Sequence, residues 1–118
     1  MALSDEARFQ VLRGERLLRE RGARRLKLRS IADAVATMLR TEFAAQRVWV
    51  FGSVVRPWFH EESDLDLAAE GIVPERRSDA WDRAIALART SIDLVFVEEA
   101  PAPLLDRIRA DGELLAER

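Results

Sequence analysis

The sequence predicts a small α/β domain of the α+β type, in which helices flank a mixed β-sheet of about three strands. Three short apolar or alternating runs, at residues 48–51, 64–69 and 91–97, are typical of strands. The segments around them repeat apolar residues at helical spacing. A length of 118 residues and a hydrophobic content of 48% suit one domain with a core of its own.

Two helices are expected before the first strand. Ser4 is a suitable cap for the first helix, which extends to about residue 20. Gly14 inside this segment and Gly22 after it argue against one straight helix, because glycine is a poor helix former. The second helix is expected at residues 26–45, with one apolar stripe that we assign to the core: Leu28, Ile31, Val35, Met38, Leu39 and Phe43.

The three strands are expected to form one sheet of mixed direction. The run at residues 48–51 is apolar throughout, which is typical of a strand inside a sheet. A helical segment joins the strands at residues 64–69 and 91–97, and such a crossover places its two strands parallel to each other. The first strand should then run antiparallel to the second, so that its end reaches the edge where the second strand begins.

Two further helices are expected after the second strand. One follows Pro74, ends near residue 89 and should turn four side chains inward: Trp81, Ala84, Ile85 and Ala88. The other follows Pro101 and Pro103 and ends near Gly112. Residues 113–118 are expected to form only a turn.

Three aspartates are the candidate catalytic and metal-binding residues. Side chains alternate along a strand, so Asp64 and Asp66 project from the same face. Asp93 begins the strand expected beside them, which brings three carboxylates to one edge of the sheet. Neighbouring carboxylates raise each other's pKa unless a cation lies between them, and oxygen ligands favour Mg²⁺ or Mn²⁺ over zinc or copper.

A Gly-Ser turn after the first strand is the candidate phosphate-binding element. Gly52 allows the backbone to approach a polyphosphate, and the Ser53 hydroxyl and amide can donate to its oxygens. Arg56 can add a positive charge to the same phosphates. Together with the carboxylates, this turn favours phosphoryl or nucleotidyl transfer, in which catalysis is mainly positioning and charge neutralisation.

These motifs resemble the signature of the DNA polymerase β-like nucleotidyltransferases, and in particular the minimal nucleotidyltransferase antitoxins of HEPN/MNT toxin–antitoxin pairs. The resemblance covers about residues 31–115 and includes the eleven-residue step from Ser53 to Asp64. It implies a nucleotidyltransferase fold for residues 29–118, with residues 1–28 as an extra N-terminal helical extension. The residues that carry it are Gly52, Ser53, Arg56, Ser63, Asp64, Leu65, Asp66, Leu67, Ile92, Asp93 and Leu94.

The resemblance also implies a reaction and a partner. Such antitoxins use Mg²⁺ and a nucleoside triphosphate, usually ATP, and are thought to transfer AMP to a tyrosine hydroxyl of a HEPN-domain RNase. Pro57 departs from the family pattern and, as a proline, fixes φ and removes a backbone N–H in the turn over the phosphates. Carried over to this chain, Gly52 and Ser53 bind triphosphate, Asp64 and Asp66 hold metal, Asp93 is the third catalytic and metal-binding carboxylate, and Arg56 and Ser63 support the nucleotide.

Two other functions stay open at this level. The fold could neutralise a toxin by contact alone, as a binding module, or it could transfer a nucleotide to a small molecule or nucleic acid. Residues 1–47 hold eleven Lys and Arg against six Asp and Glu, whereas residues 48–118 hold eight against fifteen. The basic part could meet nucleic acid, nucleotide phosphate or an acidic protein, or be a solvated helix face.

Location and assembly follow from simpler features of the sequence. It lacks cysteine, an apolar signal region and any run of membrane-spanning length, so we expect a soluble cytoplasmic protein. Nucleic acid is not expected as a direct ligand. A homo-oligomer or hetero-oligomer stays open.

Overall fold

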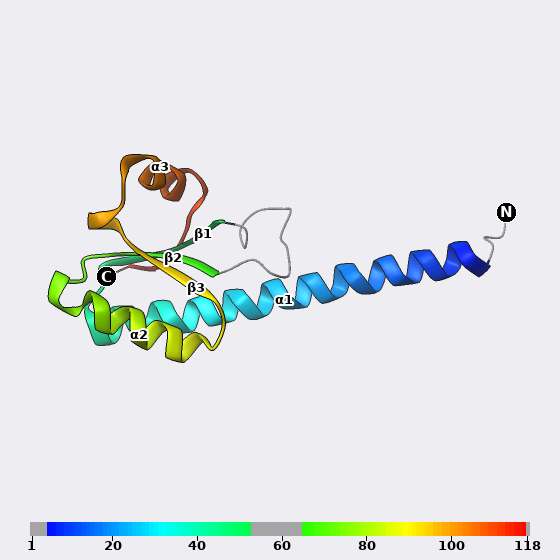
Figure 1. Ribbon diagram of the computed structural model, residues 1–118, viewed down its shortest axis with the longest axis horizontal. Helices are drawn as coiled ribbons and strands as arrows, with labels where there is room; N and C mark the ends of the chain where they lie inside the picture. The colour runs from blue at the N-terminus through cyan, green and yellow to red at the C-terminus, as the bar shows by residue number, and fades with distance from the viewer. Residues whose placement is uncertain (1–4, 53–64, 118) are drawn as a thin grey trace.

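A four-stranded sheet lies between two helices on one face and a third helix on the other (Figure 1). The computed structural model describes residues 5–52 and 65–117. Helices α1 and α2 lie on one side of the sheet and α3 on the opposite side. In chain order the elements are α1 (Asp5–Phe43), β1 (Arg47–Phe51), β2 (Leu65–Glu70), the 3-10 turn η2 (Pro74–Arg76), α2 (Arg77–Ala88), β3 (Ile92–Phe96), the 3-10 turn η3 (Val97–Glu99), α3 (Ala102–Asp111) and β4 (Glu113–Glu117).

The strand directions agree with those expected from the sequence. The sheet has the order β3-β2-β1-β4. Strand β1 pairs antiparallel with β2, whereas β2 and β3 pair parallel. Strand β1 is therefore internal, as its continuous apolar run predicted.

Alternation along the strands gives the sheet two different faces. Val48 and Val50 of β1 point to the face covered by α1 and α2, where they join Leu67 and Leu94 in the main core. Trp49 and Phe51 of β1 point to the other face, where a second, smaller cluster packs under α3. That cluster consists of Phe51, Ala68 and Ile108, with Trp49, Val95, Val97 and Leu104 packed against it.

The expected pair of N-terminal helices is in fact one helix, α1. It continues through Gly14 and Gly22, because a single glycine inside a helix costs only about 1 kcal/mol relative to alanine. The predicted apolar stripe is confirmed: Ile31 is partly buried against the core, and the other five members are buried. Helix α1 ends at Phe43, where Ala44 takes a positive φ of 58°.

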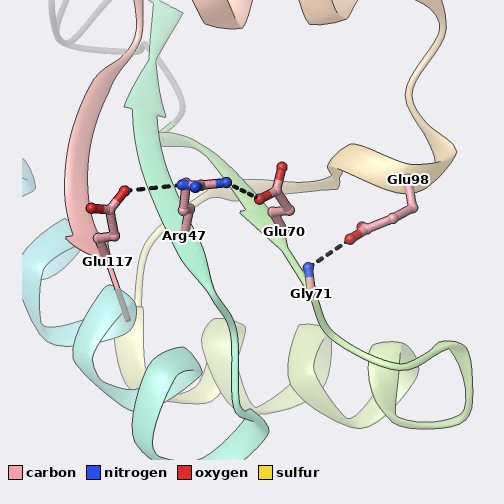
Figure 2. Close-up of polar contacts among 5 residues, drawn as sticks. All are labelled: Arg47, Glu70, Gly71, Glu98 and Glu117. Atoms are coloured by element: carbon pink, nitrogen blue, oxygen red, sulfur yellow. Dashed lines mark hydrogen bonds and ion pairs between the residues drawn. The ribbon is translucent and has the colours of Figure 1, made fainter.

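The expected C-terminal turn is instead a fourth strand, β4, which pairs antiparallel with the free edge of β1. Arg47 crosses this end of the sheet and binds a carboxylate on each neighbouring strand (Figure 2). Its guanidinium lies 2.9 Å from Glu117 of β4 and 2.6 Å from Glu70 of β2. Next to it, the Gly71 amide donates to Glu98 at 2.6 Å, which closes the end of β2.

Helix α2 occupies the expected segment with a slightly different inward face. Ala80, Ala84 and Ala88 are buried, and Trp81 packs against the core from a half-buried position. Ile85, expected to point inward, is 44% exposed. Small alanines at i, i+4 and i+8 let α2 lie close to the sheet and leave the bulkier Ile85 to the side. Within residues 5–52 and 65–117, no helix has a stretch long and apolar enough to cross a membrane.

Candidate functional site

Asp66 and Asp93 lie side by side at the beginning of two parallel strands. They are direct partners in the register of β2 and β3, so their side chains project from the same face of the sheet. Neighbouring strands lie about 4.8 Å apart, which brings two carboxylates into one small region. Leu65 and Leu67, on either side of Asp66, are fully buried on the opposite face. The alternation predicted from the sequence therefore places these two aspartates together.

Exposure differs between the two carboxylates. Asp66 is half-buried and Asp93 is exposed. Asp66 lies on an internal strand, next to Phe51 at the end of β1, whereas Asp93 lies on β3, an edge strand of the sheet. Asp93 is therefore open to a substrate that approaches from solvent, whereas Asp66 is partly enclosed by the sheet.

Gly52 brings the end of β1 against the Asp66 carboxylate. It is buried and has a φ of 77°, a conformation that side-chain-bearing residues rarely adopt. A Cβ placed on Gly52 would lie 3.1 Å from Cγ of Asp66 and would overlap its Oδ2. Glycine is therefore required here both by the backbone angle and by the close approach of the Asp66 carboxylate.

The other predicted site residues lie outside the described residues. These are Ser53, Arg56, Ser63 and Asp64, together with Pro57 and the rest of the turn predicted at residues 53–63. Among the residues that the structure describes, no three His, Cys, Asp or Glu side chains form a group that could hold a metal ion. The two described members of the predicted carboxylate trio do lie together, and the third, Asp64, falls in the undescribed part.

A contact between α1 and the end of the sheet where β2 and β3 begin was not predicted from the sequence. Arg24 of α1 donates a hydrogen bond to the Thr90 hydroxyl at 3.3 Å, just before β3. The Leu65 amide donates to the Ser91 carbonyl at 3.1 Å, which joins the beginnings of β2 and β3. No local pattern could reveal the first contact, because 66 residues separate its partners.

A pocket lies on the same face of the sheet, at the opposite end of the strands from Asp66 and Asp93. Its volume is about 330 Å³. The cluster of Phe51, Ala68 and Ile108 lies between it and the two aspartates. None of the predicted site residues lines it; its walls are Arg47, Trp49, Glu70, Val97, Leu105, Ile108 and Arg109.

A comparison with known families identifies the class to which this mixed α/β domain belongs. Residues 33–118 match the family described as polymerase beta, nucleotidyltransferase. Because this match covers most of the chain, the protein belongs to that nucleotidyltransferase family. A comparison with curated proteins found no match.

Solved structures of the same fold include chains of toxin–antitoxin complexes. A mutant of the toxin–antitoxin MntA-HpeT matches with a TM-score of 0.63 and 19% identity, over 74% of this chain and 73% of that one. A toxin–antitoxin with AMP-PNP gives 0.61 and 20%, over 73% of each chain. A tri-AMPylated Shewanella oneidensis HEPN toxin in complex with MNT antitoxin gives 0.60 and 18%, over 77% and 73%. These likenesses confirm the predicted nucleotidyltransferase fold.

Proposed function

We propose that this protein is a Mg²⁺-dependent nucleotidyltransferase that moves AMP from ATP to a hydroxyl of a HEPN-domain toxin, and so acts as an antitoxin. The observation that carries the proposal is the register pairing of Asp66 with Asp93, with Gly52 packed against Asp66. Because the chain belongs to a nucleotidyltransferase family, this arrangement supports a triphosphate site here.

Each residue of the proposed site has a separate role. Gly52 and Ser53 bind the triphosphate, because a glycine lets backbone amides come close to phosphate oxygens. Arg56 and Ser63 add a cation and a hydroxyl to the same nucleotide. Asp64 and Asp66 hold metal, and Asp93 completes the carboxylate set near the acceptor.

The side chains present fit a hard divalent cation. Asp66 and Asp93 offer only carboxylate oxygens, from adjacent positions on one face, and such donor sets suit Mg²⁺ or Mn²⁺. When bound, Mg²⁺ would neutralise phosphate charge and help the acceptor hydroxyl to lose its proton. Removal of divalent cations should therefore abolish transfer.

The reaction needs the protein mainly for positioning and for one proton. The acceptor hydroxyl oxygen bonds to the α-phosphorus of ATP as the bond from that phosphorus to the pyrophosphate oxygen breaks. Pyrophosphate leaves with the electron pair of the broken bond. The hydroxyl proton goes to the carboxylate of Asp93, which is exposed and so open to the acceptor.

The choice of acceptor is supported by the similar structures. Two of them are toxin–antitoxin complexes, one with AMP-PNP, and a third contains a tri-AMPylated HEPN toxin with its MNT antitoxin. By analogy we assign a HEPN-domain protein as the partner of this chain and ATP as the nucleotide. The same proposal places the protein in the cytoplasm, where ATP and Mg²⁺ are plentiful.

Transfer of label from ATP tests the proposal against its alternatives. The protein, its HEPN partner and Mg²⁺ are incubated with ATP labelled on the α-phosphate, and with ATP labelled on the γ-phosphate. We expect α-label alone to become covalently attached to the partner, and Asp66→Asn to abolish this. Asp82→Asn, which removes an exposed carboxylate from α2, is the matched control and should keep full transfer.

Two outcomes would overturn the assignment. If Asp66→Asn silences the toxin as well as the unaltered protein does, neutralisation is by contact and the chain is a binding module. If label appears on a nucleic acid or small molecule and not on the partner, the acceptor class is wrong.

A further inference from the structure

Helix α1 runs beneath the end of the sheet where β2 and β3 begin, which carries the proposed site. Its C-terminal end lies at the far end of the strands, where the Gln46 amide donates to the Glu70 carbonyl at 2.7 Å. Further back along the helix, Arg29 forms an ion pair with Glu113 at the beginning of β4. Five residues earlier, Arg24 reaches Thr90, which lies three residues before Asp93. The helix therefore reaches the beginnings of β2 and β3, which carry Asp66 and Asp93, at about residue 24.

The N-terminal part of α1 continues beyond the beginnings of β2 and β3 and does not pack on the sheet. Figure 1 shows it projecting well past the beginnings of β2 and β3. About nineteen residues precede Arg24 in the helix, which corresponds to a projection of about 28 Å, in a molecule of 65 × 28 × 21 Å. Among the side chains that the structure describes, burial on α1 begins only at Leu28. We call residues 5–27 the arm.

The arm carries an excess of positive charge and an exposed apolar side chain. Residues 5–27 hold eight Lys and Arg against four Asp and Glu, whereas residues 48–118 are net acidic. Arg19 and Lys27 are exposed, and neither forms an ion pair with any part of the chain that the structure describes. Leu26 is 71% exposed, more than any other large hydrophobic residue described. It lies seven residues after Arg19, which places the two on one face of the helix.

Resting on the proposed function, we propose that the arm docks the acceptor protein through an acidic surface with an apolar recess for Leu26. Position argues for the acceptor over a second copy of this chain. A protein whose hydroxyl reaches Asp93 must approach the beginnings of β2 and β3, past which the arm projects. A second copy of this chain need not approach there. The body of the chain is acidic and repels an acidic acceptor, so the basic arm supplies the attraction.

The chemistry of the arm favours a protein over a nucleic acid. Its four acidic residues, Asp5 and Glu6 at its start and Glu15 and Glu20 among the basic residues, would repel a phosphate backbone. An exposed leucine gains little on a phosphate backbone but can fill a pocket on a protein surface. The match to the nucleotidyltransferase family begins at residue 33, so the arm lies outside the part that the fold shares with its relatives.

Steady-state transfer to the HEPN partner tests the arm in the full-length protein. The arm variant combines Arg19→Glu, Leu26→Ala and Lys27→Glu, all at exposed positions, so the core should be intact. The charge-matched control combines Arg40→Glu with Arg107→Glu. Both are exposed cations outside the arm without an ion-pair partner in the described chain.

We expect the arm variant to raise KM for the partner by roughly tenfold or more, while KM for ATP and kcat at saturating partner stay unchanged. The rise of KM with salt should also be steeper for the unaltered protein than for the arm variant. The control should behave like the unaltered protein. A transfer reaction that is present but equally sensitive to partner concentration in both variants would overturn the arm proposal and leave the proposed function standing.

Two further results would also overturn it. If the arm variant changes only the oligomeric state, measured by light scattering, the arm binds a second copy. If it changes only the retention of RNA, the arm binds nucleic acid. Absence of any transfer by the unaltered protein would instead contradict the proposed function itself.

Discussion

Gly52 and Asp66 are packed so closely that no side chain fits between them. A Cβ on Gly52 would lie 3.1 Å from Cγ and 3.4 Å from Cβ of Asp66, and would overlap Oδ2. The positive φ of Gly52 turns the chain at the end of β1, and its missing side chain leaves room for the carboxylate. The end of β1 and the beginning of β2 are thus adjusted to each other at the proposed site.

Gly52→Ala should impair transfer by displacing the Asp66 carboxylate. We expect transfer to fall by about a hundredfold or more, because a displaced catalytic group loses its geometry. The left-handed backbone angle should add a loss of unfolding free energy of about 1–2 kcal/mol. Transfer rates and urea denaturation measure the two effects. Gly22→Ala, assayed at saturating partner because Gly22 lies in the arm, is the control. A Cβ there would meet no described atom within 4 Å, so kcat should be unchanged and the helix slightly stabilised. Equal activity of both variants would refute a role for the Gly52–Asp66 contact.

Asp93→Asn should separate catalysis from stability. Asp93 is exposed, so its replacement should change the unfolding free energy by no more than about 0.5 kcal/mol. As the proposed proton acceptor, its loss should lower the rate of transfer by about a hundredfold or more. Thermal denaturation and single-turnover transfer test these expectations, with Asp82→Asn as the matched control. A variant with full activity would remove Asp93 from the proposed site.

Arg47→Gln should loosen β4 without affecting the helices. The hydrogen bonds that the Arg47 guanidinium donates to Glu117 and to Glu70 raise its pKa above the usual range, the one to Glu117 most. A raised pKa means that the stabilising charge is present at all lower pH values and is lost only as the pH rises through that pKa. Arg47 therefore stays charged around neutral pH, and its contribution should not vary there. We expect faster amide hydrogen exchange in residues 113–117, whereas Arg83→Gln, which removes an exposed contact with Glu42, should leave β4 unchanged.

Ile108→Ala should weaken the attachment of α3 to the sheet. Ile108 is the only buried residue of α3, and it packs on Phe51 and Ala68. Its truncation should lower the unfolding free energy by about 2–5 kcal/mol, as for other buried aliphatic side chains. Urea denaturation provides the measurement. Leu114→Ala at a position that is 48% exposed is the control and should cost less than about 1 kcal/mol; similar losses in both would mean that α3 does not depend on this contact.

The sequence predicted the sheet around the proposed site because the relevant signals are local. Alternation identified the face of Asp66, and the strand–helix–strand rule placed β2 parallel to β3, so that Asp93 came beside it. The glycine at position 52 was recognised from its place at the end of an apolar strand. These features depend on neighbouring residues and on one general rule of chain topology.

Three features of the fold differ from the sequence prediction: the strand β4, the continuous helix α1 and the outward position of Ile85. Strand β4 has the sequence Glu-Leu-Leu-Ala-Glu, which suits a helix, and it is a strand because β1 offers an edge to pair with. Helix α1 continues through its glycines although they favour a break. Ile85 follows the expected helical period, yet the closer approach of three alanines turns it outward. The strand β4 and the outward Ile85 depend on a partner element far away in the sequence, whereas α1 is continuous because each glycine costs it only about 1 kcal/mol.

The mass of the HEPN partner after silencing tests the central claim most directly. The partner is produced together with this protein or with its Asp66→Asn variant, and intact mass and RNase activity are measured on the same sample. We predict that the unaltered protein adds one or more AMP groups and silences the RNase, and that the variant adds none and leaves the RNase active. A silenced partner of unmodified mass would contradict the account.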